Sequence, residues 1–160
     1  MPSQGACSTR PVTLYVHLRP DGTLELEGHG FLTRDTVADL LAGAHVTVRP
    51  VIDLNSRIVS TGYQPSHRLR EQTLLVKDTC FFAYCDVPAR RCDYEHTVAA
   101  PRGTTGTGNA GHACRHHHHI KTSGDWDVRQ PFRGIYVWRS PIGDVYAVDA
   151  AGTHSVTRAD

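Results

Sequence analysis

The sequence predicts an α+β protein in three parts: a small N-terminal α+β unit, a central module rich in cysteine and histidine, and a C-terminal β-hairpin. Strand-like and helix-like segments alternate through the first half of the chain. Cysteine and histidine concentrate between residues 80 and 119, and residues 133–150 return to a strand pattern. The chain of 160 residues is long enough for one ordinary domain or two small modules. Its 14 glycines and 9 prolines favour a loop-rich protein over a helical bundle.

The first segments predict a hairpin followed by a helix. Residues 12–18 (VTLYVHL) and 23–28 (TLELEG) have the composition of strands, and the Pro-Asp-Gly between them is a hairpin turn signal. We therefore expect the two segments to pair. Residues 33–43 (TRDTVADLLAG) predict a short helix with Thr33 as its N-cap and Gly43 as its stop.

A further strand and a second helix complete the predicted N-terminal unit. Residues 45–54 (HVTVRPVIDL) are strand-like. Residues 66–78 (SHRLREQTLLVKD) follow a proline and have the apolar spacing of a helix. Its buried face is expected to contain Leu69, Leu74 and Leu75. No residue pattern in this unit predicts a catalytic site.

The C-terminal part predicts a β-hairpin of residues 133–140 (RGIYVWRS) and 144–150 (DVYAVDA). Trp126 and Trp138 are expected in the core rather than stacked on bases, because large aromatic side chains in short hairpins are usually buried. Upstream, the loop 103–111 (GTTGTGNAG) lacks the Gly-Lys-Ser/Thr ending of a phosphate-binding loop. We expect it to bridge two strands of another hairpin.

These segments divide the chain into five predicted regions. They are a flexible N-terminus (1–11), the α+β unit (12–78), the Cys/His module (79–126), the C-terminal β-hairpin (127–152) and a flexible tail (153–160).

The net charge and hydropathy of the chain bear on whether the protein binds nucleic acid or enters a membrane. A formal net charge of +1 gives no global argument for nucleic-acid binding, so such binding must come from a local patch such as residues 115–121. No stretch approaches the roughly 20 apolar residues that span a bilayer, and the first residues lack a hydrophobic signal region. The sequence therefore predicts a cytoplasmic protein with no membrane partner, and it indicates no protein partner.

The cysteines predict a metal site. The chain has five, an odd number that disfavours a disulfide framework in a reducing compartment. Two short pairs, separated by about thirty residues, have the spacing of a structural zinc site. The predicted ligands are Cys80, Cys85, Cys114 and His117. Cys92 or His116 could replace one ligand, and the alternative is that the cysteines are small buried apolar residues.

The tract CRHHHHIKT (114–122) contributes to this site. A purification tag would normally lie at a terminus, and a solvated histidine tract would need no partners. Cys80 and Cys85 supply such partners, so a metal site is the better explanation.

A second set of residues has the parts needed for metal-assisted phosphodiester hydrolysis. Glu95 and His96 are adjacent, Asn109 follows in the loop and His118 follows His117. A carboxylate and one imidazole can hold a divalent ion on the scissile phosphate, which leaves the other imidazole to deprotonate water.

In this pattern the sequence resembles the HNH endonucleases, through CDVPARRCDYEHTV, CRHHHHIKT and GIYVWRSPIGDVYAV in order. The resemblance covers residues 12–155 and points to the C-terminal half of a large actinobacterial HNH family with a long N-terminal domain. It implies a ββα-metal fold for the central module. The three name-giving catalytic residues would be His96, Asn109 and His118.

The resemblance also implies the role of each residue. His96 would be the general base, and Asn109 would position the hairpin or the base. Glu95 and His118 would bind the catalytic divalent ion, Mg²⁺ or another. Arg115 and Lys121 would contact DNA phosphate.

The chain departs from the family at three positions. It has Glu95 where Asp is usual, and Ala110 and Ala113 where leucines are usual. The sequence therefore predicts a metal-dependent DNA endonuclease, with a catalytically decayed, zinc-stapled nucleic-acid-binding module as the alternative. A metal-storage protein built on the histidine tract is a third interpretation, and it requires His116 and His119 to be essential.

Overall fold

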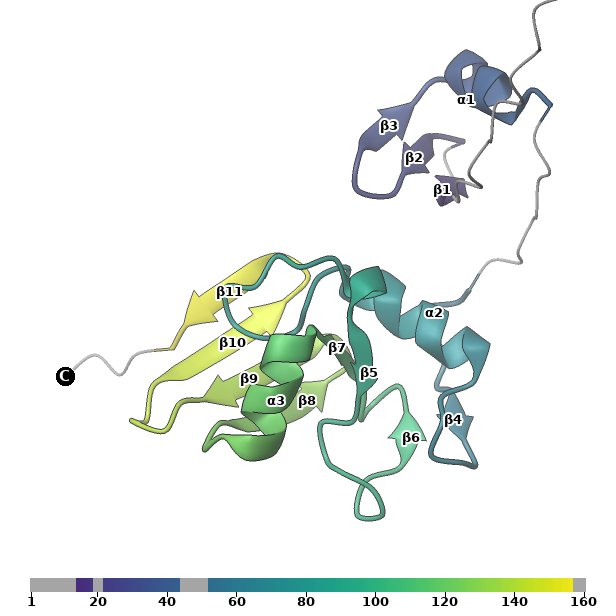
Figure 1. Ribbon diagram of the computed structural model, residues 1–160. Helices are drawn as coiled ribbons and strands as arrows, with labels where there is room; N and C mark the ends of the chain where they lie inside the picture. The colour runs from purple at the N-terminus through teal and green to yellow at the C-terminus, as the bar shows by residue number, and fades with distance from the viewer. Residues whose placement is uncertain (1–13, 19–21, 44–51, 157–160) are drawn as a thin grey trace, which may run out of the picture. The chain divides into compact units, whose positions relative to one another are not determined.

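The computed structural model describes residues 14–18, 22–43 and 52–156. Within these residues the protein is mixed α+β, with three α-helices and several small sheets (Figure 1). The chain forms two compact units, Met1–Pro50 and Val51–Asp160. The predicted unit of residues 12–78 is therefore divided, because the helix predicted at its end belongs to the second unit. None of the helices in the described ranges has the length and apolar character that a membrane crossing needs.

The first unit contains a three-stranded antiparallel sheet and a helix. Its strands, in sheet order, are β1 (Val16–Leu18), β2 (Leu24–Leu26) and β3 (Gly30–Leu32). The predicted pairing of 12–18 with 23–28 is confirmed by the register Val16 to Leu26. The strand β3 was not predicted. It follows a second tight turn in which Gly28 has a φ of +78°, a left-handed conformation that favours glycine.

The helix of the first unit, α1 (Arg34–Leu41), begins as the sequence predicts. The Thr33 hydroxyl oxygen accepts a hydrogen bond from the Thr36 backbone N–H at 3.2 Å, which satisfies a free donor of the first turn. The predicted strand 45–54 lies mostly outside the described residues, and its described part, 52–54, is not in a strand.

In the second unit, the helix α2 (His67–Val76) confirms the prediction for residues 66–78. Ser66 caps it by accepting from the Leu69 N–H at 3.2 Å. Leu69 and Leu74 are buried as predicted, whereas Leu75 is half-buried. The helix packs on the strand β7 (Gly111–Ala113). This long-range contact is why it joins the second unit.

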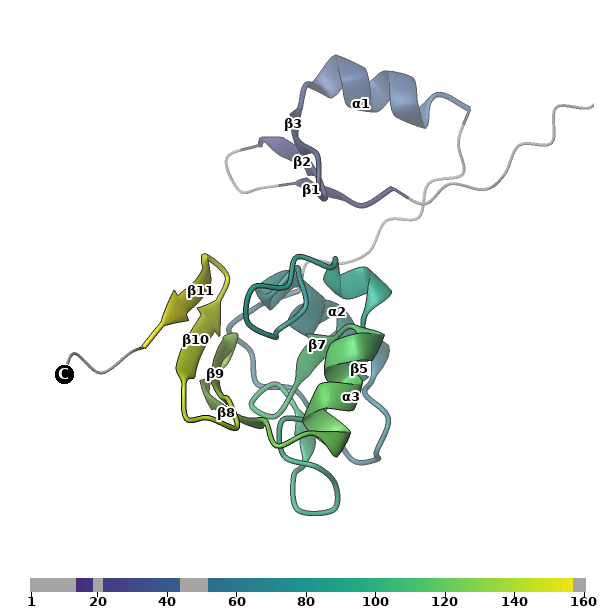
Figure 2. The same cartoon turned by 60° about the vertical axis from the view of Figure 1, so that its left-hand side comes forward.

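The centre of the second unit is a hairpin with a helix beside it. The strands β5 (Asp93–Glu95) and β7 are antiparallel, with Asp93 opposite Ala113. The helix α3 (Arg115–Ser123) follows β7 and lies along both strands in Figures 1 and 2. The loop between β5 and β7 contains β6 (Thr105–Gly106), which pairs with β4 (Val59–Ser60). A short 3₁₀ helix, η1 (Ala89–Arg91), precedes β5.

The predicted C-terminal hairpin is the middle of a four-stranded antiparallel sheet. Its strands are β8 (Asp127–Phe132), β9 (Ile135–Arg139), β10 (Val145–Asp149) and β11 (Gly152–Ser155), in the order β11-β10-β9-β8. The strands β9 and β10 confirm the predicted pair. The strand β11 extends into the region predicted as a flexible tail. The Asp149 Oδ1 atom accepts from Ala151 N at 2.8 Å and from Gly152 N at 3.1 Å, which closes the turn that returns the chain to the sheet.

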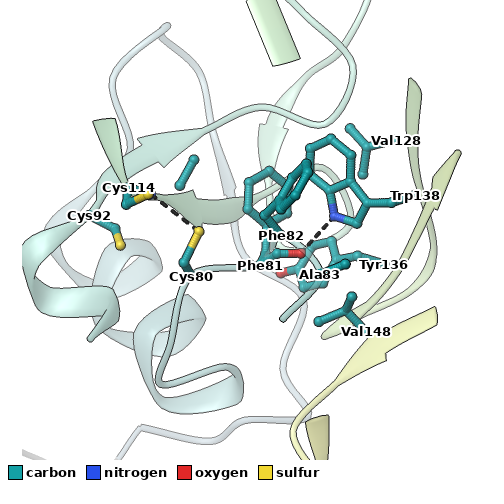
Figure 3. Packing of buried hydrophobic residues seen from close by; sticks show 11 residues of the cluster. Cys80, Phe81, Phe82, Ala83, Cys92, Cys114, Val128, Tyr136, Trp138 and Val148 are labelled. Atoms are coloured by element: carbon teal, nitrogen blue, oxygen red, sulfur yellow. Dashed lines mark hydrogen bonds between the residues drawn. The ribbon is translucent and has the colours of Figure 1, made fainter. Parts of the chain in front are cut away.

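The core lies between this sheet and the central hairpin (Figure 3). Trp138 is fully buried and its Nε1–H donates to the Phe81 carbonyl oxygen at 2.7 Å, which confirms it as a core residue. Trp126 is partly buried against the same cluster. Ala110 and Ala113 are both completely buried, and Ala113 belongs to this core cluster.

Candidate metal centre and adjoining polar site

Cys80 and Cys85 lie on a tight turn at the edge of the core. Cys80 N–H donates to the Val87 carbonyl at 2.8 Å, and Cys85 N–H donates to the Phe82 carbonyl at 3.3 Å. Tyr84 has a φ of 58°, which is uncommon for a side chain other than glycine, asparagine or aspartate. This backbone path turns both thiols toward the same point.

Cys114 and His117 come from the start of α3. Cys114 is the N-cap residue of the helix, and its backbone N–H donates to the Cys80 Sγ atom at 3.4 Å (Figure 3). His117 Nδ1 lies 3.2 Å from the Cys114 Sγ and 3.6 Å from the Cys80 Sγ. The Phe82 ring stacks on the His117 ring, with centroids 4.0 Å apart and planes at 8°. The imidazole is thereby fixed with Nδ1 toward the thiols.

The four predicted zinc ligands form one cluster that could hold a metal ion. Their ligand atoms all lie within 4.8 Å of one another. In tetrahedral zinc, with Zn–S bonds near 2.3 Å and Zn–N bonds near 2.0 Å, sulfur and nitrogen lie about 3.5 Å apart. The sulfur–nitrogen distances of 3.2 and 3.6 Å in the cluster are close to this separation. The donor set of three thiols and one imidazole is compatible with zinc.

Neither predicted substitute joins this cluster. Cys92 is buried, and its thiol donates to the Pro88 carbonyl at 3.4 Å. His116 is exposed on α3, with its ring centroid 4.9 Å from that of His117. Within the described residues the cysteines are free thiols, without disulfides.

The thiols are held in an environment that disfavours thiolates unless a cation is present. Burial raises the pKa of Cys80 and of Cys85, backbone hydrogen bonds lower both in part, and the Cys114 thiol raises both further. Burial also raises the pKa of Cys92 to about 11. A bound metal cation reverses this balance at its ligands, because it binds the deprotonated thiolate and releases the proton.

His118 of α3 meets Glu95 of β5 on a neighbouring face of the same helix. Glu95 ends β5, and its Oε2 lies 2.8 Å from the His118 Nε2. The Glu95 side chain is 11% exposed and that of His118 30%. The His118 Nδ1 is buried, and no described residue forms a hydrogen bond with it.

Lys121 and Arg115, the two predicted phosphate contacts, form ion pairs with acidic residues of β5. Lys121 Nζ lies 2.8 Å from the Glu95 Oε1, and both side chains are 11% exposed. Residues 118 and 121 are three positions apart on a helix, so they share a face and reach the same carboxylate. Arg115 lies 3.3 Å from Asp93, but its side chain is 72% exposed. Arg115 is thus accessible to a ligand, whereas Lys121 is bound within the site.

His96, the predicted general base, is enclosed by residues that the sequence did not single out. It is 5% exposed, and its Nε2 lies 2.9 Å from the Thr105 Oγ1. The Tyr63 ring stacks on the imidazole, with centroids 5.1 Å apart and planes at 30°. Burial lowers the pKa of His96, the Lys121 cation lowers it further and the Glu95 carboxylate opposes both. This shift favours the neutral, basic form of the ring.

Asn109 forms its hydrogen bonds with the loop that follows His96. Its Oδ1 accepts from Thr97 Oγ1 at 2.7 Å and from Val98 N at 2.6 Å. Its Nδ2 donates to the Val98 and Thr104 carbonyls, each at 2.9 Å. Of the two predicted roles, positioning the hairpin is the one that these contacts support.

Sequence reasoning missed Thr105 and Tyr63. Thr105 lies in a loop of glycines and threonines in which no residue stands out, and Tyr63 precedes a helix more than thirty residues upstream of His96. Only the pairing of β4 with β6 brings the two together. No local pattern signals that contact.

Comparisons with known proteins find relatives that are much longer than this chain. The chain is 33% identical over 151 residues to the uncharacterized protein Rv2100 of Mycobacterium tuberculosis (strain ATCC 25618 / H37Rv), covering 86% of the chain and 27% of that relative. It is 35% identical over 133 residues to the uncharacterized protein Rv3776 of the same strain, covering 81% of the chain and 25% of the relative. The chain thus spans about a quarter of the length of these relatives. No protein-family model and no solved structure matches the chain.

Proposed function

We propose that the protein is a metal-dependent endonuclease of the HNH type that hydrolyses DNA phosphodiester bonds. The observation that carries the proposal is the 2.8 Å contact between Glu95 Oε2 and His118 Nε2, with His96 next to Glu95 in the chain. The resemblance of residues 12–155 to the HNH family supports the same assignment. The adjoining zinc staple, formed by Cys80, Cys85, Cys114 and His117, would fix α3 against the hairpin.

Glu95 and His118 are the residues that would hold the catalytic ion. Neighbouring ligands of an octahedral ion with bonds near 2.1 Å lie about 3 Å apart, so the observed separation of 2.8 Å suits such a pair. A divalent ion bound there, Mg²⁺ or another, supplies charge stabilisation to the scissile phosphate.

His96 would deprotonate the attacking water, since its pKa is lowered and its ring is held in one orientation. Asn109 would keep the loop that carries His96 in place through its four hydrogen bonds. Arg115 would bind a DNA phosphate and position the duplex without reading its sequence.

Nicking of supercoiled plasmid tests the proposal. We expect nicking that requires added divalent ion and is abolished in His96→Ala, while the zinc content stays at the parent level. The matched control is His119→Ala, an exposed histidine of α3 outside both sets of ligands. Equal nicking by the parent and His96→Ala would refute the assignment.

The alternative, a catalytically decayed nucleic-acid-binding module, is favoured by one observation. Lys121 already occupies the second carboxylate oxygen of Glu95. On this reading the purified chain binds zinc and DNA and shifts DNA in a gel, but it cuts no plasmid with any divalent ion.

A further inference from the structure

The His96 imidazole is contacted by Thr105 through one ring nitrogen. Thr105 is 5% exposed and lies in β6, where it pairs with Ser60 of β4. Its Oγ1 lies 2.9 Å from the His96 Nε2. The position of this hydroxyl is therefore set by a strand pair and not by the loop alone.

The same hydroxyl has a second partner. Thr105 Oγ1 lies 3.1 Å from the backbone carbonyl oxygen of Tyr63, which can only accept a hydrogen bond. A threonine hydroxyl has one hydrogen. Both contacts are satisfied only if Thr105 donates to Tyr63 and accepts from a protonated His96 Nε2.

This arrangement determines the tautomer of His96. With the hydrogen on Nε2, the lone pair of the neutral imidazole is on Nδ1. No described residue forms a hydrogen bond with Nδ1. The stacked Tyr63 ring covers one face of the imidazole and restricts its rotation.

We propose that Thr105 is a positioning residue that fixes His96 as the Nε2–H tautomer and so presents Nδ1 as the basic atom. The catalytic consequence rests on the proposed nuclease function, whereas the tautomer itself does not. The strand pair β4–β6 therefore connects a segment upstream of α2 to the reacting group.

The tautomer is tested by ¹⁵N NMR of the histidine side chains at about pH 8, above the ordinary pKa of an imidazole. We expect the Nε2–H form of His96 in the parent, with a slowly exchanging Nε2 proton. Thr105→Val should lose that slow exchange, and Thr105→Ser should keep it. The matched control is Thr107→Val, a buried threonine two residues further along the chain that forms no hydrogen bond with His96 in the described part of the structure. An Nδ1–H tautomer in the parent, or an unchanged slow proton in Thr105→Val, overturns the proposal.

The catalytic consequence is measured by plasmid nicking with the same variants. Thr105→Val should lower kcat on the order of a hundredfold, with a much smaller change in KM, since a misoriented base affects the chemical step. Thr105→Ser should recover most of the rate. If Thr105→Val does not fold, Thr105→Ala takes its place, with zinc content and circular dichroism as the check. Parent-level kcat in a folded, hydroxyl-free variant overturns the positioning role.

The two sets of measurements separate the possible failures. A parent protein that shows the slow Nε2 proton but never nicks DNA refutes the proposed function and leaves the role of Thr105 in fixing the tautomer supported. A parent protein that nicks DNA while His96 is in the Nδ1–H tautomer supports the proposed function and refutes the role of Thr105 in fixing the tautomer.

Discussion

Glu95 and Lys121 form a buried ion pair at the centre of the candidate catalytic site, with 2.8 Å between Oε1 and Nζ. The other oxygen of Glu95 faces His118 at the same distance. The lysine ammonium therefore occupies one of the two oxygens that a divalent ion would use. A metal ion entering the site has to compete with this internal cation or displace it.

Lys121→Met should consequently tighten the binding of Mn²⁺. Removal of a nearby positive charge favours the divalent ion, and a coupling of about 1 kcal/mol corresponds to about a fivefold lower dissociation constant. Isothermal titration calorimetry on the zinc-loaded protein measures the change. Arg115→Met, which removes an exposed cation from the same helix, should leave the affinity nearly unchanged. Weaker Mn²⁺ binding by Lys121→Met would show that the lysine supports the ion and does not compete with it.

Cys114→Ser should abolish stoichiometric metal binding and unfold much of the central module. A structural zinc site contributes folding free energy directly. Loss of one ligand therefore removes the metal and the cross-link that it makes between segments of the chain. Cys92→Ser provides the control, because Cys92 is buried nearby and lies outside the ligand cluster. Elemental analysis should find about one zinc per chain in the parent and in Cys92→Ser. Full zinc occupancy in Cys114→Ser would remove Cys114 from the ligand set.

His112 should make the protein less stable in mild acid. It is 2% exposed, and burial, followed by the charge of Arg70, lowers its pKa from 6.5 to about 4. The unfolded chain therefore binds the proton first. The contribution of neutral His112 to the free energy of unfolding is complete above pH 6.5. It is lost as the pH falls toward 4, and the loss is up to about 3 kcal/mol.

Urea unfolding at several pH values measures this loss. Because protonation of the candidate metal ligands would also destabilise the protein in acid, the informative quantity is the difference between the parent and His112→Gln. The glutamine variant retains a group that can bond to the Thr73 hydroxyl, the partner of His112 Nε2 at 2.9 Å. We expect the variant to have the shallower dependence on pH. Parallel curves for the two proteins would mean that His112 titrates normally.

Gly111→Ala should destabilise the second unit. A Cβ atom at Gly111 would lie 2.6 Å from the Phe81 Cδ2 and 2.9 Å from its Cγ, and Phe81 is completely buried. Overpacking of this kind costs about 1–3 kcal/mol. Gly108→Ala, in the loop that leads into β7, has open space around the added Cβ and should be close to neutral. Equal thermal stability of the two variants would contradict the packing described for Phe81.

The sequence predicted those parts of the molecule that depend on nearby residues. Thr33 and Ser66 cap the two predicted helices through contacts within three residues. The metal cluster was predictable because each pair of ligands lies on a single turn, and only the meeting of the two pairs is long-range.

Long-range contacts account for what the sequence did not show. The sequence placed α2 in the N-terminal unit, since its apolar face does not reveal that β7 is its partner. The role of Thr105 depends on the pairing of β4 with β6, and both strands are only two residues long. Such short pairs leave no periodic pattern for sequence reasoning to detect.

His117 and His118 are consecutive in α3, yet one faces the thiol cluster and the other faces Glu95. Consecutive residues of an α-helix point about 100° apart, so a single turn of helix connects the two groups of side chains rigidly. The number of residues between Cys114 and His118 is therefore fixed by geometry. One inserted residue would rotate either the imidazole at the thiols or the imidazole at Glu95 out of place. Evolution can change the chemical identity of positions in this turn, but it cannot lengthen or shorten the turn and keep both.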